Sequence, residues 1–146
     1  MKYQIIVDSC ADLDNNYLDG TGIGLKIVPL TINVGDKEYV DLEGVNIDEM
    51  LNELKTPKIK SSSACPSPES FEKEFQNAEY TFVVTITSKL SGCYNSALLA
   101  ENNYADSAHV HVIDSKAVSG TEILIVDKLV ELIKADLDFD TIVHEI

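Results

Sequence analysis

Short apolar runs alternate with longer amphipathic stretches along most of the chain. The apolar runs are rich in β-branched residues and predict strands over residues 4–7, 80–86 and 110–113. Two segments, 94–104 and 121–137, have the composition and spacing of helices. Strands that alternate with helices predict an α/β fold with a mostly parallel sheet, flanked by helices on both faces.

The region after the first strand follows a different pattern. Residues 25–41 alternate in part between apolar and polar positions around Gly35-Asp36-Lys37, which predicts a β-hairpin. Residues 46–54 carry apolar side chains at helical spacing, and Asn46 is expected to cap that helix. A short helix with acidic residues in its first turn is predicted over residues 12–18.

The serine-rich segment 61–68 is predicted to be a loop. Ser67 and Pro68 have the residue types of an N-cap and a first helical position, so we expect a helix that continues through Phe71 and Phe75. The chain shows no internal repeat and no linker, so residues 1–146 are expected to form a single α/β domain. Asp138 to Asp140 are expected to cap a last helix, and the sequence stops inside it, as a fragment would.

The charge of the chain excludes several classes of partner. Eleven Lys and Arg against 25 Asp and Glu give a net charge of −14. Nucleic acids and anionic membrane surfaces would be repelled. The longest aliphatic run, residues 123–126, is too short to span a bilayer, so no stable membrane insertion is expected. Three cysteines without metal-binding spacing favour free thiols in a reducing cytoplasm.

Polar residues follow three of the predicted strands directly. Asp8-Ser9, Thr87-Ser88 and Asp114-Ser115 are expected to gather at one edge of the sheet, because parallel strands end together and ligands bind there. The hydroxyl-rich segments 61–68 and 87–92 each precede a predicted helix, and helix N-termini favour anions. This combination predicts a site for a small anionic head group, such as a carboxylate or a phosphate. No strong acid, base or metal ligand set accompanies the hydroxyls, so we expect binding and no metal cofactor.

Two other classes of function stay open at this stage. A hydrolase or transferase with a cysteine or serine nucleophile would need a base, and the chain offers His109, His111 and His144. An interaction module would use the acidic surface to bind a basic partner. The Asp8 and Asp114 carboxylates are expected to hold loops by accepting backbone hydrogen bonds.

Five motifs, in order along the chain, resemble those of the DegV family. The most specific is residues 86–97, Ile-Thr-Ser-Lys-Leu-Ser-Gly-Cys-Tyr-Asn-Ser-Ala, which is similar to the family pattern I-S-S-x-L-S-G-T-Y-x-S-A. The others are residues 6–13, 28–32, 63–68 and 112–120. Ser63 stands where the family's T-S-x-P-S loop begins with threonine, and Cys93 stands where the pattern has its second threonine.

The resemblance implies a bacterial carrier that holds a long-chain fatty acid, of about 16–18 carbons, between two α/β lobes. It implies that a separate fatty acid kinase subunit carries out the ATP chemistry, so the carrier is not itself an enzyme. The residues carried over as carboxylate ligands are Ser63 and Ser91. Further residues expected around the pocket are Ser9, Ser62, Cys65, Gly92, Cys93 and Ser115. The family's C-terminal lobe is expected to be absent from these 146 residues.

Overall fold

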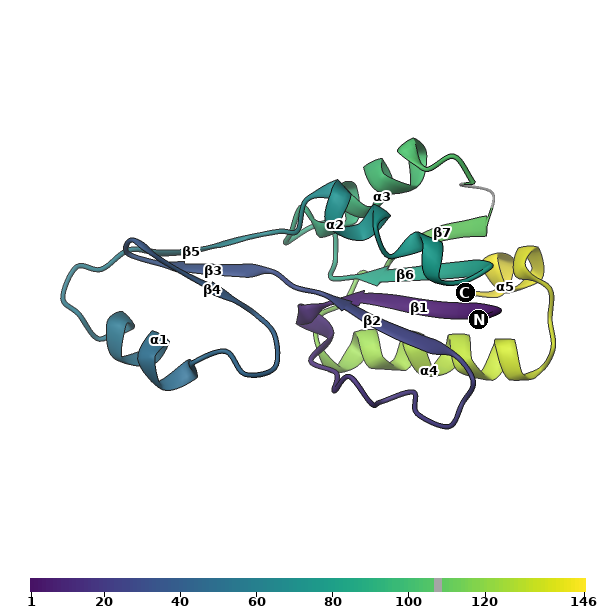
Figure 1. Ribbon diagram of the computed structural model, residues 1–146, viewed down its shortest axis with the longest axis horizontal. Coiled ribbons are helices and arrows are strands. Elements are labelled where there is room, and N and C mark those ends of the chain that lie inside the picture. Colours follow the sequence, from purple (N-terminus) through teal and green to yellow (C-terminus); the bar gives the residue numbers. More distant parts are fainter. Residues whose placement is uncertain (107–108) are drawn as a thin grey trace.

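The computed structural model describes residues 1–106 and 109–146, and it divides the chain into a body and an arm (Figure 1). The body contains a four-stranded parallel sheet in the order β2-β1-β6-β7. Its strands are β1 (Tyr3–Asp8), β2 (Gly24–Val28), β6 (Tyr80–Thr85) and β7 (Val110–Asp114). The two central strands, β1 and β6, are buried on both faces, which explains their nearly continuous apolar sequences.

Helices cover both faces of this sheet, as the sequence predicts. They are α2 (Pro68–Glu72) and α3 (Cys93–Asn103) on one face, and α4 (Gly120–Lys134) and α5 (Phe139–Glu145) on the other. A hydrophobic core lies on each face of the sheet, and successive side chains of β1 point alternately into one core and the other. Ile6 packs with Phe71 and Phe75 in one core, whereas Ile5 packs with Leu129 in the other. Short 3₁₀ turns, η1 (Ser9–Ala11) and η2 (Phe75–Asn77), follow β1 and α2.

The arm projects from the body at the end of the sheet far from both chain termini (Figure 1). It contains an antiparallel sheet in the order β4-β3-β5, with helix α1 beside it. The elements of the arm are β3 (Thr31–Val34), β4 (Lys37–Val40), β5 (Ser61–Ala64) and α1 (Ile47–Leu54). Val34 and Tyr39 are buried, whereas Ile47 and Leu51 on α1 are exposed.

The structure confirms the predicted fold class and refines the predicted hairpin. The turn at Gly35-Asp36 joins β3 and β4 as expected. Residues 24–28, at the start of the predicted hairpin, instead form β2 and pair in parallel with β1. Residues 24–34 therefore supply one strand to each of the two sheets, β2 to the parallel sheet and β3 to the antiparallel one. The alternation of apolar and polar residues does not separate the two strands, because both are partly buried.

Three local predictions are wrong. Residues 12–18 form turns instead of a helix, and Asp12 adopts a left-handed backbone (φ 56°) that a helix does not tolerate. Residues 61–64 form β5 instead of a loop, since their backbone pairs with β3. Helix α2 begins as predicted, with Ser67 at the N-cap position and Pro68 in the first turn, but it ends at Glu72 instead of continuing through Phe75. The Ser67 hydroxyl lies 3.3 Å from the Ser70 hydroxyl and makes no capping bond to the backbone.

No helix within the described ranges 1–106 and 109–146 has both the length and the apolar composition that crossing a bilayer requires.

The cap of α1 gives a test of the arm. Asn46 Oδ1 accepts the Glu49 N–H at 3.1 Å, and no residue of α1 is buried, so the helix depends strongly on this cap. Asn46→Ala should lower the opening free energy of α1 by about 1 kcal/mol. Hydrogen exchange of the α1 amides measures it. Asn52→Ala is the matched control, because it removes an exposed asparagine from the same helix without touching the cap; equal exchange in both variants would contradict the prediction.

Candidate functional site

The carboxyl ends of β1, β6 and β7 meet at the edge of the sheet that faces the arm (Figure 1). Asp8 is fully buried there, and its two carboxylate oxygens accept the N–H groups of Cys10 at 3.0 Å and Ile86 at 2.8 Å. Asp114 accepts both the N–H (3.0 Å) and the hydroxyl (2.5 Å) of Ser88. The structure thus places both aspartates in the loop-holding role predicted from the sequence.

Ser91 lies in the loop between β6 and α3, directly before the first turn of the helix. Its Oγ accepts the backbone N–H of Cys93 at 3.2 Å and donates to the Cys93 Sγ at 3.1 Å. The hydroxyl is half-buried, and Cys93 beneath it is fully buried. Ser91 is therefore a polar donor that is held in place and still reachable from outside.

Ser63 belongs to the arm, and the chain that follows it returns to the same edge of the body. It lies near the end of β5, exposed, in register with Ile32 of β3. Just beyond it, a Cβ atom added at Gly92 would lie 3.0 Å from the Cys65 Sγ. The Ser96 hydroxyl also donates to the Pro66 carbonyl at 2.6 Å. These contacts join the segment after Ser63 to the first turn of α3, so the two serine segments meet as the sequence predicts.

The other residues expected around the pocket separate into two groups. Cys65, Gly92 and Cys93 adjoin Ser91 through the contacts described above. Ser62 points to the opposite face of the arm from Ser63, because neighbouring residues on a strand alternate. Ser9 accepts the Leu30 N–H at 3.0 Å and fixes the base of the arm, and the Ser115 hydroxyl bonds only within its own loop, to Ala117, among the described contacts.

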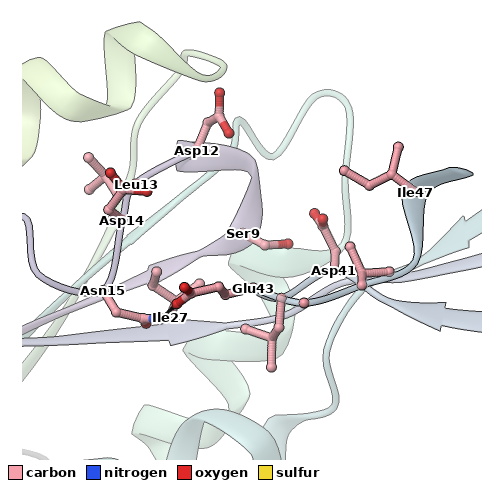
Figure 2. A pocket seen from close by; sticks show the side chains of 12 residues that line it. Ser9, Asp12, Leu13, Asp14, Asn15, Ile27, Asp41, Glu43 and Ile47 are labelled. Atoms are coloured by element: carbon pink, nitrogen blue, oxygen red, sulfur yellow. Dashed lines mark hydrogen bonds between the residues drawn. The ribbon is translucent and has the colours of Figure 1, made fainter.

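A cleft of about 400 Å³ opens between the base of the arm and the loop after η1 (Figure 2). Figure 2 shows that acidic side chains surround it, namely Asp12, Asp14, Asp41 and Glu43. Neither Ser63 nor Ser91 lines this cleft, although Ser9 does. Its negative charge would repel a carboxylate or a phosphate. The cleft therefore does not suit the anionic head group that the sequence predicts.

The environments of Cys10 and Cys93 do not favour nucleophilic chemistry. Burial, with the nearby Asp8, raises the pKa of the Cys93 thiol to about 12, and the same two causes raise the pKa of Cys10 to about 12. Both thiols are therefore protonated at neutral pH, whereas a cysteine nucleophile needs a thiolate. Within residues 1–106 and 109–146, no group of His, Cys, Asp and Glu side chains is arranged to hold a metal ion.

The histidines lie away from Ser91 and Cys93. His109 precedes β7 at the opposite edge of the sheet, where its ring packs edge-on against Tyr80. His144 is on α5, which packs through Phe139 against the same tyrosine. His111 lies on β7 beside Phe82, and burial lowers its pKa. None of the hydrogen bonds found in the described part of the chain joins a histidine to Ser91 or Cys93.

Sequence reasoning missed the buried carboxylate of Glu122, on the first turn of α4. Glu122 Oε1 accepts the Ser119 N–H at 3.0 Å, but Oε2 is buried and bonds to no group in the described ranges. Burial, and then the charge of Asp8, raise the pKa of Glu122 to about 7. The spacing Ser119-x-x-Glu122 is that of a capping box, which is the sequence signal for this contact.

Comparison with known proteins gives a consistent result. The model of the family described as "Uncharacterised protein, DegV family" matches residues 2–146. A DegV domain-containing protein of Streptococcus gordonii is 40% identical over 149 residues, which cover 100% of this chain and 53% of the relative. The chain thus spans about half the length of the curated relatives it matches.

Two solved structures with the same fold carry fatty acids. The fatty acid kinase B3 protein of Streptococcus pneumoniae, loaded with linoleic acid, superposes with a TM-score of 0.90 at 39% identity; the match covers 99% of this chain and 53% of that one. A DegV family protein of Eubacterium eligens, loaded with heptadecanoic acid, gives 0.87 at 33% identity, covering 98% and 51%. These structural neighbours are therefore fatty-acid-binding proteins.

The contact between Cys65 and Gly92 can be tested by adding one methyl group. Gly92→Ala should shift the Cys65 side chain and lower the unfolding free energy by about 0.5–1 kcal/mol, because the new Cβ would lie 3.0 Å from the Cys65 Sγ and this exposed side chain can rotate to relieve part of the contact. Urea denaturation measures it. Gly120→Ala is the control, since a Cβ at Gly120 meets nothing within 4 Å. Equal stability of the two variants would contradict the contact.

The raised pKa of Glu122 predicts a pH-dependent stability. Between its ordinary value of 4.5 and about 7, the folded protein holds a proton on Glu122 that the unfolded chain releases. The unfolding free energy should therefore fall as the pH rises from about 5 to 8. Glu122→Gln keeps an oxygen for Ser119 and should reduce this fall by about 1–2 kcal/mol, measured by urea denaturation at both pH values. Glu131→Gln, on an exposed part of the same helix, is the control; an unchanged fall in Glu122→Gln would contradict the prediction.

Proposed function

Because the chain belongs to the DegV family, we propose that it binds a long-chain fatty acid by its carboxylate and presents the acid to a fatty acid kinase subunit. The proposal is carried by one observation above all, which is that the segments bearing Ser63 and Ser91 meet at the N-terminus of α3. The fatty acids in the structures of two relatives support the choice of ligand.

The electrostatics of this edge suit an anion on an acidic protein. With a net charge of −14, the chain needs local donors to hold a carboxylate. The hydroxyls of Ser63 and Ser91 are neutral donors, and the 11-residue helix α3 adds the positive end of its dipole. No basic side chain is required for this arrangement. The carboxylate would be oriented by the serines, each contributing about 1.5–3 kcal/mol.

The acyl chain is expected to supply most of the affinity. About 14 buried methylenes at roughly 0.8 kcal/mol each give an upper bound near 11 kcal/mol before the costs of association. Two apolar side chains near these elements are exposed. Leu90, next to Ser91 in the chain, is 72% accessible, and Val40, at the end of β4 at the base of the arm, is 49% accessible. We propose that these side chains contact the tail, and that a second half, of the kind that the relatives have, completes its cover.

The chain would act as the carrier in a two-component reaction in the cytoplasm. The kinase subunit would bring ATP and phosphorylate the carboxylate that the serines hold. The name of the Streptococcus pneumoniae relative supports a partnership of this kind. Exposure of the head-group end is what such a transfer needs, since a kinase must reach the carboxylate.

Substitution of the two serines tests the site. Ser63→Ala and Ser91→Ala should each weaken oleate binding about tenfold or more, because each removes a hydrogen bond to a charged group. Titration calorimetry measures the affinity. Methyl oleate, which has the same tail without the charge, should bind the variants and the unmodified chain alike.

Ser61→Ala is the matched control, because Ser61 lies on the same side of β5 two residues before Ser63 and farther from α3. It should leave oleate affinity unchanged. Wild-type affinity in the Ser63→Ala, Ser91→Ala double variant would remove the proposed head-group site. Failure of the unmodified chain to bind any long-chain acid would remove the function proposed for this chain.

A further inference from the structure

Exposed apolar side chains gather on the arm. Five of the 11 large apolar side chains that are exposed in the described part of the chain fall within residues 40–54. Three of them lie on α1, where Ile47 is 55%, Leu51 46% and Leu54 38% accessible. Their spacing of four and then three residues places them in one stripe along the helix. An exposed apolar stripe of this kind marks an interaction surface.

The packing of α1 within the arm leaves this stripe uncovered. Lys37 Nζ on β4 lies 3.0 Å from Glu49 Oε1 and 2.6 Å from Glu53 Oε1, and these two ion pairs attach one side of the helix to the sheet. At about 100° per residue, both glutamates lie on the side of α1 that is turned away from the stripe. Figure 1 shows that α1 also lies apart from the body. The stripe therefore faces outward from the arm.

Two exposed charges flank the stripe near its opposite ends. Asp48 and Lys55 are seven residues apart, so they lie on the same side of the helix, almost two turns from each other. Neither forms an ion pair within residues 1–106 and 109–146. Both charges are therefore available to a partner that lies along the stripe.

The order of these residues along α1 fits a second copy of the same helix. Ile47 and Leu54 lie at nearly equal distances before and after Leu51, and so do Asp48 and Lys55. Two copies related by a two-fold axis at Leu51 run antiparallel, with the apolar ends of each stripe against those of the other. Asp48 of each copy then faces Lys55 of the other, whereas a parallel pair would bring like charges together.

Local charge balance allows two acidic copies to meet at this surface. Residues 46–60 carry three acids and three lysines, so the segment is neutral in a chain of net charge −14. In about 0.15 M salt, exposed charges that are more than about 8 Å apart are largely screened from each other. Because the arm projects from the body, contact through α1 keeps the two acidic bodies apart (Figure 1).

We infer that the exposed stripe of α1 is an interface between two copies of this chain, which pair antiparallel about Leu51. The inference goes beyond the proposed function and does not depend on it, because the proposed head-group site lies at the start of α3. An eight-residue helix is about 12 Å long, so each copy covers much less than the roughly 800 Å² per partner of a stable interface. The dimer is therefore weak, with a dissociation constant of about 0.1 mM.

Sedimentation equilibrium measures this association. In about 0.15 M salt, the mean mass of the unmodified chain should rise toward that of two chains between about 10 µM and 1 mM. Leu51→Glu should weaken association at least tenfold, because it places two like charges at the centre of the interface. Leu124→Glu is the matched control, since it changes an exposed leucine on α4 of the body, and it should associate like the unmodified chain. Both leucines are exposed, so both variants should fold.

Charge reversal tests the antiparallel arrangement. Asp48→Lys and Lys55→Glu should each associate about tenfold more weakly than the unmodified chain, because each substitution makes both charge pairs of the dimer repulsive. An equimolar mixture of the two variants should recover the association of the unmodified chain. In the mixed dimer, both pairs between positions 48 and 55 are again of opposite sign.

Each of three results would overturn the inference. They are an unmodified chain that stays monomeric at about 1 mM, Leu51→Glu that associates like the unmodified chain, and a mixture that associates no better than its separate components. The stripe would then be left for another partner, such as a second half of the kind that the relatives have. Leu51→Glu should bind oleate like the unmodified chain, so failure of this interface leaves the proposed function standing.

Discussion

The buried carboxylate of Asp8 is the constraint on which the functional edge of this protein depends. A fully buried acid is stable only if its oxygens are satisfied, and here the partners come from the end of β6 and from η1. These bonds join two neighbouring strands at the point where their loops begin. Burial raises the pKa of Asp8, and the pKa of Glu122 is raised first by its own burial and then by the charge of Asp8.

The arm contributes the second part of the site, and it does so at a distance along the chain. Between β3 and β5 the chain passes through α1 and returns antiparallel, so Ser63 is brought back toward the body. The Ser96–Pro66 hydrogen bond and the close contact of Cys65 with Gly92 then attach the end of β5 to α3. In the proposed site, the body and the attached arm each contribute a neutral donor on a molecule of charge −14. That combination suits the charged end of a ligand whose affinity comes mainly from an apolar tail.

Local pattern was sufficient for most of the body and, in the arm, for the β3–β4 turn and for α1, but it was insufficient for β5. The apolar sequences of β1 and β6 and the polar residues after them predicted the parallel sheet and the edge at which its loops gather. Strand β5 was missed because Ser61 to Ala64 have no apolar alternation, and only the distant backbone of β3 makes them a strand. The contact of Cys65 with Gly92 and the hydrogen bond from Ser96 to the Pro66 carbonyl are similarly non-local. Glu122 carried a capping signal, but its burial depends on the packing of α4 against η1.

The central claim is that Ser63 and Ser91 hold the charged end of a fatty acid together at the start of α3. A crystal structure of the chain grown with oleate tests it most directly. The account predicts a carboxylate within about 3.2 Å of both Oγ atoms, with the Ser91 hydroxyl turned from the Cys93 sulfur to the ligand. A carboxylate bound in the acidic cleft beside Asp12 and Asp41, or one that contacts neither serine, would contradict the account.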